Sequence, residues 1–284
     1  MRLFYVIVLF LLTSEVATSQ SFYAVRRPRN LMIMGGTGTT HYKGDLQDPG
    51  RLTKTRYNIS AGAEYFVHPL ISTRVELTYF RLAGADAASK DQERRDRNLS
   101  FFSGNVELST AATINLLKTP PRKFYQRPVF NLYLLGGGGG LYSSAKTIRD
   151  NGEKIALQPI RTEGVKYSRL HPIVFGGAGL RIFYNPFFNI LVEASYRFTF
   201  TDHLDDVATK RYYNDSRATY TLTDPLAIEL NKRAIGPAVV RANPENNDGY
   251  LFMNLKVQYY LEGEFFTKSQ NKLFTVKRRG TRRR

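Results

Sequence analysis

The sequence of 284 residues contains no cysteine and no tryptophan. The absence of cysteine excludes disulfides, thiolate metal sites and cysteine nucleophiles. Beyond its first residues, the chain also lacks an apolar run of the roughly 20 residues that a membrane-spanning helix needs. If the mature chain lies in a membrane, it must cross as a closed barrel, because strands satisfy their backbone hydrogen-bonding groups there only in that form.

The start of the chain has the pattern of an export signal. Arg2 gives a positive start, residues 4–12 form an apolar core, and Ala17 and Ser19 have the spacing of a cleavage site. We predict a signal peptide over residues 1–19. A membrane anchor helix is the alternative, but its apolar run is too short to span a bilayer.

The formal net charge is +17. Such a charge is compatible with nucleic-acid binding, but an exported chain meets anionic lipid, surface glycans and acidic proteins instead. We therefore expect outer-membrane lipid among the partners and no nucleic acid.

Aromatic residues are abundant, with 18 tyrosines and 19 phenylalanines, and this composition favours strands. The clearest alternation lies in 187–201, where Val192 and Phe198 fall on one face and Glu193 and Arg197 on the other. A period of two over about ten residues is typical of a strand whose faces meet different environments. Strands are predicted near residues 31–42, 56–67, 71–83, 99–117, 128–144, 171–184, 187–201 and 249–261.

The connections between these strands are alternately short and long. Links at 68–70 and 185–186 are tight, whereas 43–55 and 202–248 are long and polar. This asymmetry is typical of an outer-membrane barrel with short periplasmic turns and long outer loops. We predict an all-β fold over residues 20–262: a closed antiparallel transmembrane β-barrel of about eight strands with both termini periplasmic. A soluble sandwich would also alternate, but it does not explain the loop pattern.

Aromatic residues near the strand ends predict two girdles at the membrane interfaces. The girdle beside the short turns would contain Phe66, Phe183, Tyr184, Phe187, Phe188, Tyr259 and Tyr260. The girdle toward the long loops would contain Tyr57, Tyr79, Phe198, Phe200 and Tyr250.

The polar strand faces carry four acidic and four basic residues. An eight-stranded barrel is wide enough only for side chains to fill it, so these charges must pair. We predict a lumen ion-pair network with a structural role, and a proton or solute path is the alternative. Its members are Glu64, Arg74, Glu76, Glu107, Arg181, Glu193, Arg197 and Lys256.

No residue pattern demands catalysis. A lipid-modifying enzyme at the outer rim would need His41, His171 or His203, but no spacing points to a triad. Asp202, Asp205 and Asp206 do not have the spacing of a known calcium loop, and a capped turn explains them. We expect no catalytic residue, no metal and no cofactor.

The last segment, residues 263–284, is a basic tail that is too polar to continue the barrel. Either it is a solvated tail, or it is an electrostatic docking segment for an acidic periplasmic partner or for headgroups. The candidate docking residues are Lys268, Lys272, Lys277, Arg278, Arg279, Arg282, Arg283 and Arg284.

Three segments resemble elements of the PorG-like outer-membrane barrels of the type IX secretion system of Bacteroidetes. Residues 41–46 resemble an aromatic-x-Gly-Asp-Leu element, and 249–260 resemble the closing strand. The most specific likeness is in 196–207, with the motif residues Asp202, His203, Leu204, Asp205 and Asp206.

This resemblance implies a non-enzymatic component of a protein-export machine. Proteins of this family are thought to tie periplasmic ring components, PorK and PorN, to the outer membrane. A stand-alone barrel for envelope integrity or surface ligand binding is the alternative function.

Overall fold

The computed structural model describes residues 29–44, 46, 55–92, 95, 99–120, 126–148, 152–161, 166–207 and 247–262. The predicted signal peptide and basic tail lie outside them.

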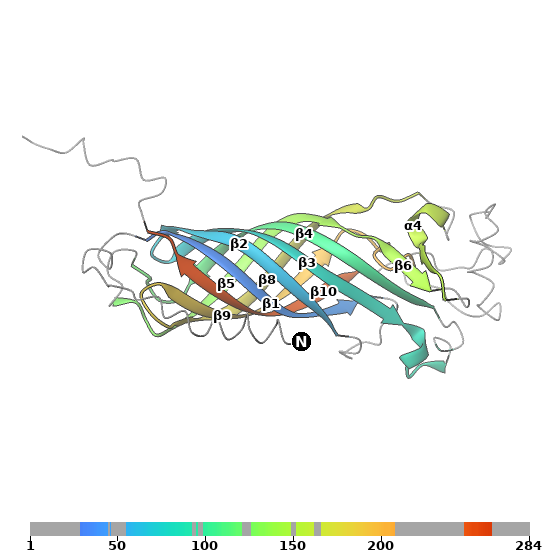
Figure 1. The fold of residues 1–284 in the computed structure, drawn as a ribbon, viewed down its shortest axis with the longest axis horizontal. Coiled ribbons are helices and arrows are strands. Elements are labelled where there is room, and N and C mark those ends of the chain that lie inside the picture. The colour runs from blue at the N-terminus through green and yellow to red at the C-terminus, as the bar shows by residue number, and fades with distance from the viewer. Residues whose placement is uncertain are drawn as a thin grey trace, which may run out of the picture.

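The described residues form one antiparallel sheet of ten strands, and eight of these strands close into a barrel (Figure 1). Closure comes from β1 pairing with both β2 and β10, and from β3 pairing with β4. This confirms the predicted fold class, and each strand begins and ends within two residues of its prediction. The eight strands are β1 (Leu31–Lys43), β2 (Arg56–His68), β3 (Ile71–Ala85), β4 (Ser100–Asn115), β5 (Phe130–Tyr142), β8 (Leu170–Phe183), β9 (Phe188–Thr199) and β10 (Gly249–Tyr260).

Four short elements lie in two connections that the sequence left unassigned. A 3-10 helix, Asp86–Ala88, follows β3, and β6 (Ala145–Ile148), β7 (Lys154–Ala156) and α4 (Leu157–Ile160) precede β8. β6 pairs with the start of β4, so the β6–β7 hairpin prolongs the wall at one end of the barrel (Figure 1). These elements are too short to show a periodic pattern. Among the described residues, no helix is long and apolar enough to cross a membrane.

The two faces of the wall have opposite polarity, as the alternation predicts. On β3, Val75 and Leu77 are about half exposed on the outside, whereas Arg74 and Glu76 are buried inside. The same exposed apolar face continues on β4, β9 and β10 with Leu108, Val192 and Leu255. A water-soluble protein has the reverse arrangement, so the exterior is suited to lipid.

Two glycines make room for lumen side chains. A Cβ atom at Gly36 would lie 2.5 Å from Cγ of Lys256, and one at Gly179 would lie 2.4 Å from Cζ of Tyr133. Any larger residue at either position would collide with a side chain that fills the interior.

The aromatic girdles are only partly as predicted. Tyr57, Phe198 and Tyr184 are exposed on the outside. Three members were assigned wrongly, because Phe66, Tyr250 and Tyr260 are buried. They fall on the same alternating positions as the lumen residues of their strands, so the period of two places their rings inside.

Candidate functional site

The interior of the barrel is the candidate functional site, and the structure places all eight predicted charged residues there. Each is at most 5% exposed. Their positions on alternate residues of β2, β3, β4, β8, β9 and β10 direct them toward the barrel axis. The eight residues are Glu64, Arg74, Glu76, Glu107, Arg181, Glu193, Arg197 and Lys256.

Arg74 is the centre of a network of six of these residues. Its Nη1 atom donates to Oε2 of Glu193 at 2.6 Å, and its Nη2 atom donates to Oε2 of Glu64 at 3.2 Å. Arg181 donates to the other oxygen of Glu64 at 2.6 Å. Since β9 is not a neighbour of β3 and β8 is not a neighbour of β2, the Arg74–Glu193 and Arg181–Glu64 bonds cross the lumen and join opposite walls.

Lys256 completes the network. Its Nζ atom lies 2.7 and 2.8 Å from the two carboxylate oxygens of Glu76, and 3.0 Å from Oε1 of Glu193. The network therefore contains three acidic and three basic residues, and the cluster as a whole carries no net charge. This neutrality matters, because an unpaired charge in such surroundings costs several kcal/mol.

Neutral side chains make further hydrogen bonds to the network. Ser72 and Gln258 donate to Glu64, and the Tyr133 hydroxyl donates to Glu193 at 3.0 Å. Asn115 accepts from Arg181 at 3.1 Å. Buried ion pairs are tolerated only when such extra hydrogen bonds are present.

The other two predicted charges form a separate pair. Nε of Arg197 lies 3.5 Å from Oε1 of Glu107, whose second oxygen accepts from the Tyr250 hydroxyl at 2.6 Å. The guanidinium group of Arg197 also lies 4.0 Å from the ring centroid of Phe252. A cation over an aromatic face is stabilised by the ring quadrupole.

Little free volume remains between the two charge clusters. The cavity bounded by Arg74, Glu76, Glu193 and Arg197, together with small and apolar neighbours, has a volume of about 10 Å³. That is about the space that one water molecule requires. The interior at this level is therefore filled by side chains.

Toward the long connections the interior is aromatic, whereas the sequence analysis assigned Tyr250 to an outer girdle. The Phe80 ring lies 4.8 Å from the Tyr250 ring and 4.9 Å from the Phe252 ring. Tyr42 and Phe101 pack edge to face at 5.0 Å. These rings belong to one buried cluster, so an apolar layer lies between the ionic network and the long connections.

The family-like motif folds into the mouth at this aromatic end. Leu204, Asp205 and Asp206 are nearly inaccessible to solvent. The Tyr42 hydroxyl lies 2.7 Å from a carboxylate oxygen of Asp205 and 2.7 Å from one of Asp248. Tyr42 thus ties β1 to both segments that flank residues 208–246.

Backbone contacts explain the local shape of the motif. Asp205 accepts from the amide of Val207, which makes the capped turn that the sequence predicts, and Asp248 accepts from the amide of Leu204. Asp206 has a φ of 66°, a conformation that Asp adopts more readily than most residues. Within the described part of the chain, no group of three or more His, Cys, Asp or Glu residues is arranged to hold a metal ion.

The histidines near the rim make structural contacts. His41 lies within 3.3 Å of the Thr39 hydroxyl and 3.2 Å of the Thr55 hydroxyl. The His203 ring stacks on Tyr167 at 4.8 Å, and Tyr167 in turn donates to Asp206 at 2.6 Å. His203 therefore belongs to the packing of the motif.

Two buried arginines at the short-turn end were missed by the sequence analysis. Arg29 donates to the Pro186 carbonyl and to Glu262, both at 3.0 Å. Arg127 lies 4.1 Å from the ring centroid of Tyr260. Both residues lie outside the alternating segments, so no periodic signal marked them. The candidate docking residues between Lys268 and Arg284 lie outside the described residues.

An apolar exterior around a charge-filled interior defines a small membrane-spanning β-barrel. No protein-family model matches the sequence, and a search of curated proteins finds no relative.

Among solved structures, the chain is similar to Neisserial surface protein A, with 8% identity, a TM-score of 0.45, and coverage of 81% of this chain and 97% of that one. It is also similar to OprG of Pseudomonas aeruginosa, with 9% identity, a TM-score of 0.42, and coverage of 84% and 98%. Ail of Yersinia pestis, solved with the heparin analogue sucrose octasulfate, has 14% identity, a TM-score of 0.40, and coverage of 82% and 99%.

Proposed function

We propose that this chain is a non-enzymatic outer-membrane barrel of a type IX protein secretion machinery, and that it anchors PorK/PorN-like periplasmic ring proteins. The observation that carries the anchoring role is the filled lumen. The interior is occupied by six charged residues joined by ion pairs, by an aromatic layer and by the motif at the mouth. A barrel filled in this way is suited to hold other proteins at the membrane and not to conduct them.

Three further features support the proposal. The exposed apolar wall is suited to a bilayer, and the predicted signal peptide would deliver the chain across the inner membrane. The likeness of residues 196–207 to the PorG-like motif supplies the link to type IX secretion. The basic tail, with Lys268, Lys272 and the arginines at 278–284, offers a charged segment for an acidic ring protein.

The proposal is tested by deleting the gene and measuring the secreted proteins of the culture. We expect loss of export for many cargo proteins, with restoration by the full chain. A second strain carries a chain without residues 268–284, and we expect fewer ring proteins to co-purify with it from detergent. A matched control replaces the tail with a neutral segment of equal length, which separates the role of charge from that of length.

Normal export in the deletion strain would contradict the secretion role. If the same strain showed a leaky envelope or altered surface binding, the stand-alone barrel would be the better function. If the chain without residues 268–284 recovers as many ring proteins as the full chain, the tail is not the docking segment. The barrel itself would then make the contact.

A further inference from the structure

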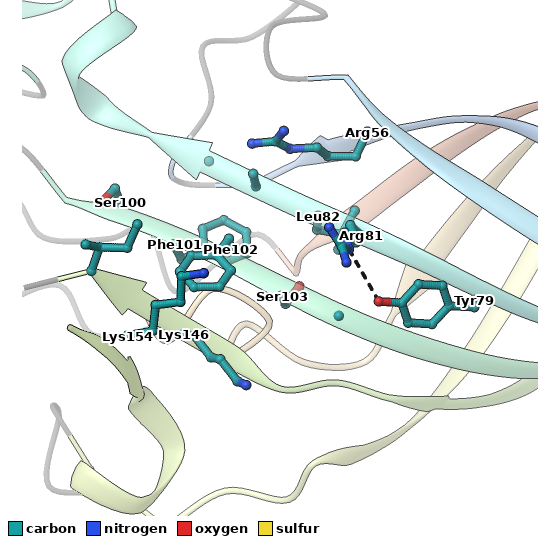
Figure 2. A pocket seen from close by; sticks show the side chains of 14 residues that line it. Arg56, Tyr79, Arg81, Leu82, Ser100, Phe101, Phe102, Ser103, Lys146 and Lys154 are labelled. Carbon is teal, nitrogen blue, oxygen red and sulfur yellow. Dashed lines mark hydrogen bonds between the residues drawn. The ribbon is translucent and has the colours of Figure 1, made fainter. Parts of the chain in front are cut away.

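A hollow on the outer wall of the barrel is lined by four cations. It has a volume of about 510 Å³ and lies where β3, β4 and the β6–β7 hairpin meet. Its basic residues are Arg56, Arg81, Lys146 and Lys154, and none of the described lining residues is acidic. Figure 2 shows Arg81 on β3 and the two lysines on the hairpin strands, with Phe102 between them.

Strand register explains why Arg81, Phe102 and Lys146 gather. Arg81 pairs with Gly104, and Phe102 pairs with both Ala83 and Lys146. Side chains on paired residues point to the same face of a sheet, and Arg81 is two residues after the exposed Tyr79. Because Gly104 has no side chain, it leaves the floor of the hollow open.

The hollow lies at the boundary of the apolar belt. Along the outer face of β3, the residues run from Val75 and Leu77 through Tyr79 to Arg81. Tyr79 accepts a hydrogen bond from Arg81 at 3.3 Å (Figure 2). Arg81 also lies 5.5 Å from the ring centroid of Tyr57. A change from aliphatic to aromatic to cationic side chains is typical of the level at which hydrocarbon gives way to headgroups.

We propose that this hollow binds a phosphorylated glycolipid of the outer leaflet, of the lipid A type. The cations contact its phosphate groups, and Phe102 and Tyr79 provide apolar surface beside its sugars and acyl chains. The hollow opens through the side wall at headgroup height, so a lipid reaches it by moving within the membrane plane. The inference rests on the proposed outer-membrane orientation, in which the connection after β3 faces outside.

Charge complementarity favours this occupant over a neutral lipid. Each Lys or Arg near an anionic membrane surface adds to the electrostatic attraction. Two phosphates on one glycolipid match a cluster of four cations better than the single phosphate of a common phospholipid does. A site volume of several hundred Å³ is also in the range of small-ligand sites.

The test measures binding to the full chain, purified in detergent, by native mass spectrometry. The probes are bisphosphorylated lipid A, monophosphorylated lipid A, phosphatidylethanolamine, inorganic phosphate and sucrose octasulfate. We expect the tightest binding for bisphosphorylated lipid A and weaker binding for the monophosphorylated form. Inorganic phosphate, at the same concentration, should not displace the lipid.

The variant R56Q/R81Q/K146Q/K154Q should weaken binding of bisphosphorylated lipid A by at least about tenfold, because four attractive charges are lost. The matched control K43Q/K90Q/K118Q/K166Q removes the same charge from other exposed lysines and should change binding by less than about twofold. Folding of both variants is checked by the gel-mobility difference between folded and unfolded barrels.

A second variant keeps every charge. Gly104→Leu fills the hollow, and its Cβ atom would meet only Tyr79, at ordinary or slightly close contact distances of 3.4 and 3.9 Å. We expect it to fold and to bind lipid A more weakly. Three outcomes would overturn the proposal. The first is equal binding of lipid A by the wild type and both hollow variants. The others are binding that does not depend on the number of phosphates, and binding of sucrose octasulfate in preference to lipid A. Because the measurement uses purified protein, its failure would leave the secretion role untouched.

Discussion

The two halves of the barrel interior are built in different ways. The half near the short turns holds a neutral network of three acidic and three basic residues, with bonds that cross the lumen. The half near the long connections is packed with aromatic rings around Phe80, Tyr250 and Phe252, and these rings contact the separate Arg197–Glu107 pair. The stability of the first half depends on which charges pair, whereas the stability of the second depends on how well the rings fill the space.

This difference predicts different responses to substitution. Removing one member of an ion network leaves its partner buried without a counter-charge, and the loss exceeds the value of the pair itself. Removing atoms from an aromatic layer costs only the lost contacts and the cavity left behind. The same number of deleted atoms should therefore be more damaging in the ionic half.

The largest effect is expected for Arg74→Met, since Arg74 bonds to both Glu64 and Glu193. We expect the free energy of unfolding to fall by about 3 to 5 kcal/mol. The measurement is urea unfolding in lipid vesicles, followed by tyrosine fluorescence, which the absence of tryptophan makes easy to interpret. The exposed Lys118→Met serves as the control and should leave the unfolding midpoint unchanged.

The double variant R74M/E193Q tests whether the lost charge balance causes this fall in stability. It removes one cation and one anion, so the interior is neutral again, and it should be more stable than R74M alone. A double variant whose loss equals the sum of the two single losses would show that charge balance does not govern this half.

Much of this arrangement could be predicted from the sequence, because a period of two assigns each residue to a face. That pattern identified the strands and placed Glu64 and Lys256 inside. It could not tell which charges pair, since Arg74 and Glu193 are 119 residues apart in the chain and Lys256 and Glu76 are 180 apart. Such pairs depend on strand order, tilt and register around the closed barrel.

The aromatic half was missed for a related reason. Alternation shows that Tyr250 and Phe252 share a face with Lys256, but a ring on that face was interpreted as part of a girdle. The period of two shows which face of a strand a residue lies on, but not how far along the barrel axis it lies. The position of the motif over the mouth depends on Tyr42, a residue more than 160 positions away from Asp205.

A smaller effect is expected for Phe252→Leu in the aromatic half. The ring contacts Phe80 and Arg197, and leucine fills part of the same space. We expect a loss of about 1 to 2 kcal/mol in the free energy of unfolding, from lost contacts and a small cavity. The same urea experiment measures it, and a loss as large as that of Arg74→Met would remove the contrast between the two halves.

The smallest effect on stability is expected for Tyr42→Phe, which removes only the hydroxyl that reaches Asp205 and Asp248. We expect a loss of about 1 kcal/mol, the typical net contribution of one hydrogen bond. The sharper readout is limited proteolysis, where cleavage near residues 202–207 should become several times faster. Unchanged cleavage would show that Tyr42 does not hold the motif in the mouth.

The central claim is that paired charges and packed rings close the interior to ions. Electrical recording across a planar bilayer tests it most directly, with the folded wild-type chain reconstituted at single-molecule density. We predict a current that stays at the level of the protein-free bilayer over the full range of applied voltage. Steady, reproducible channel openings from the folded chain would contradict the claim.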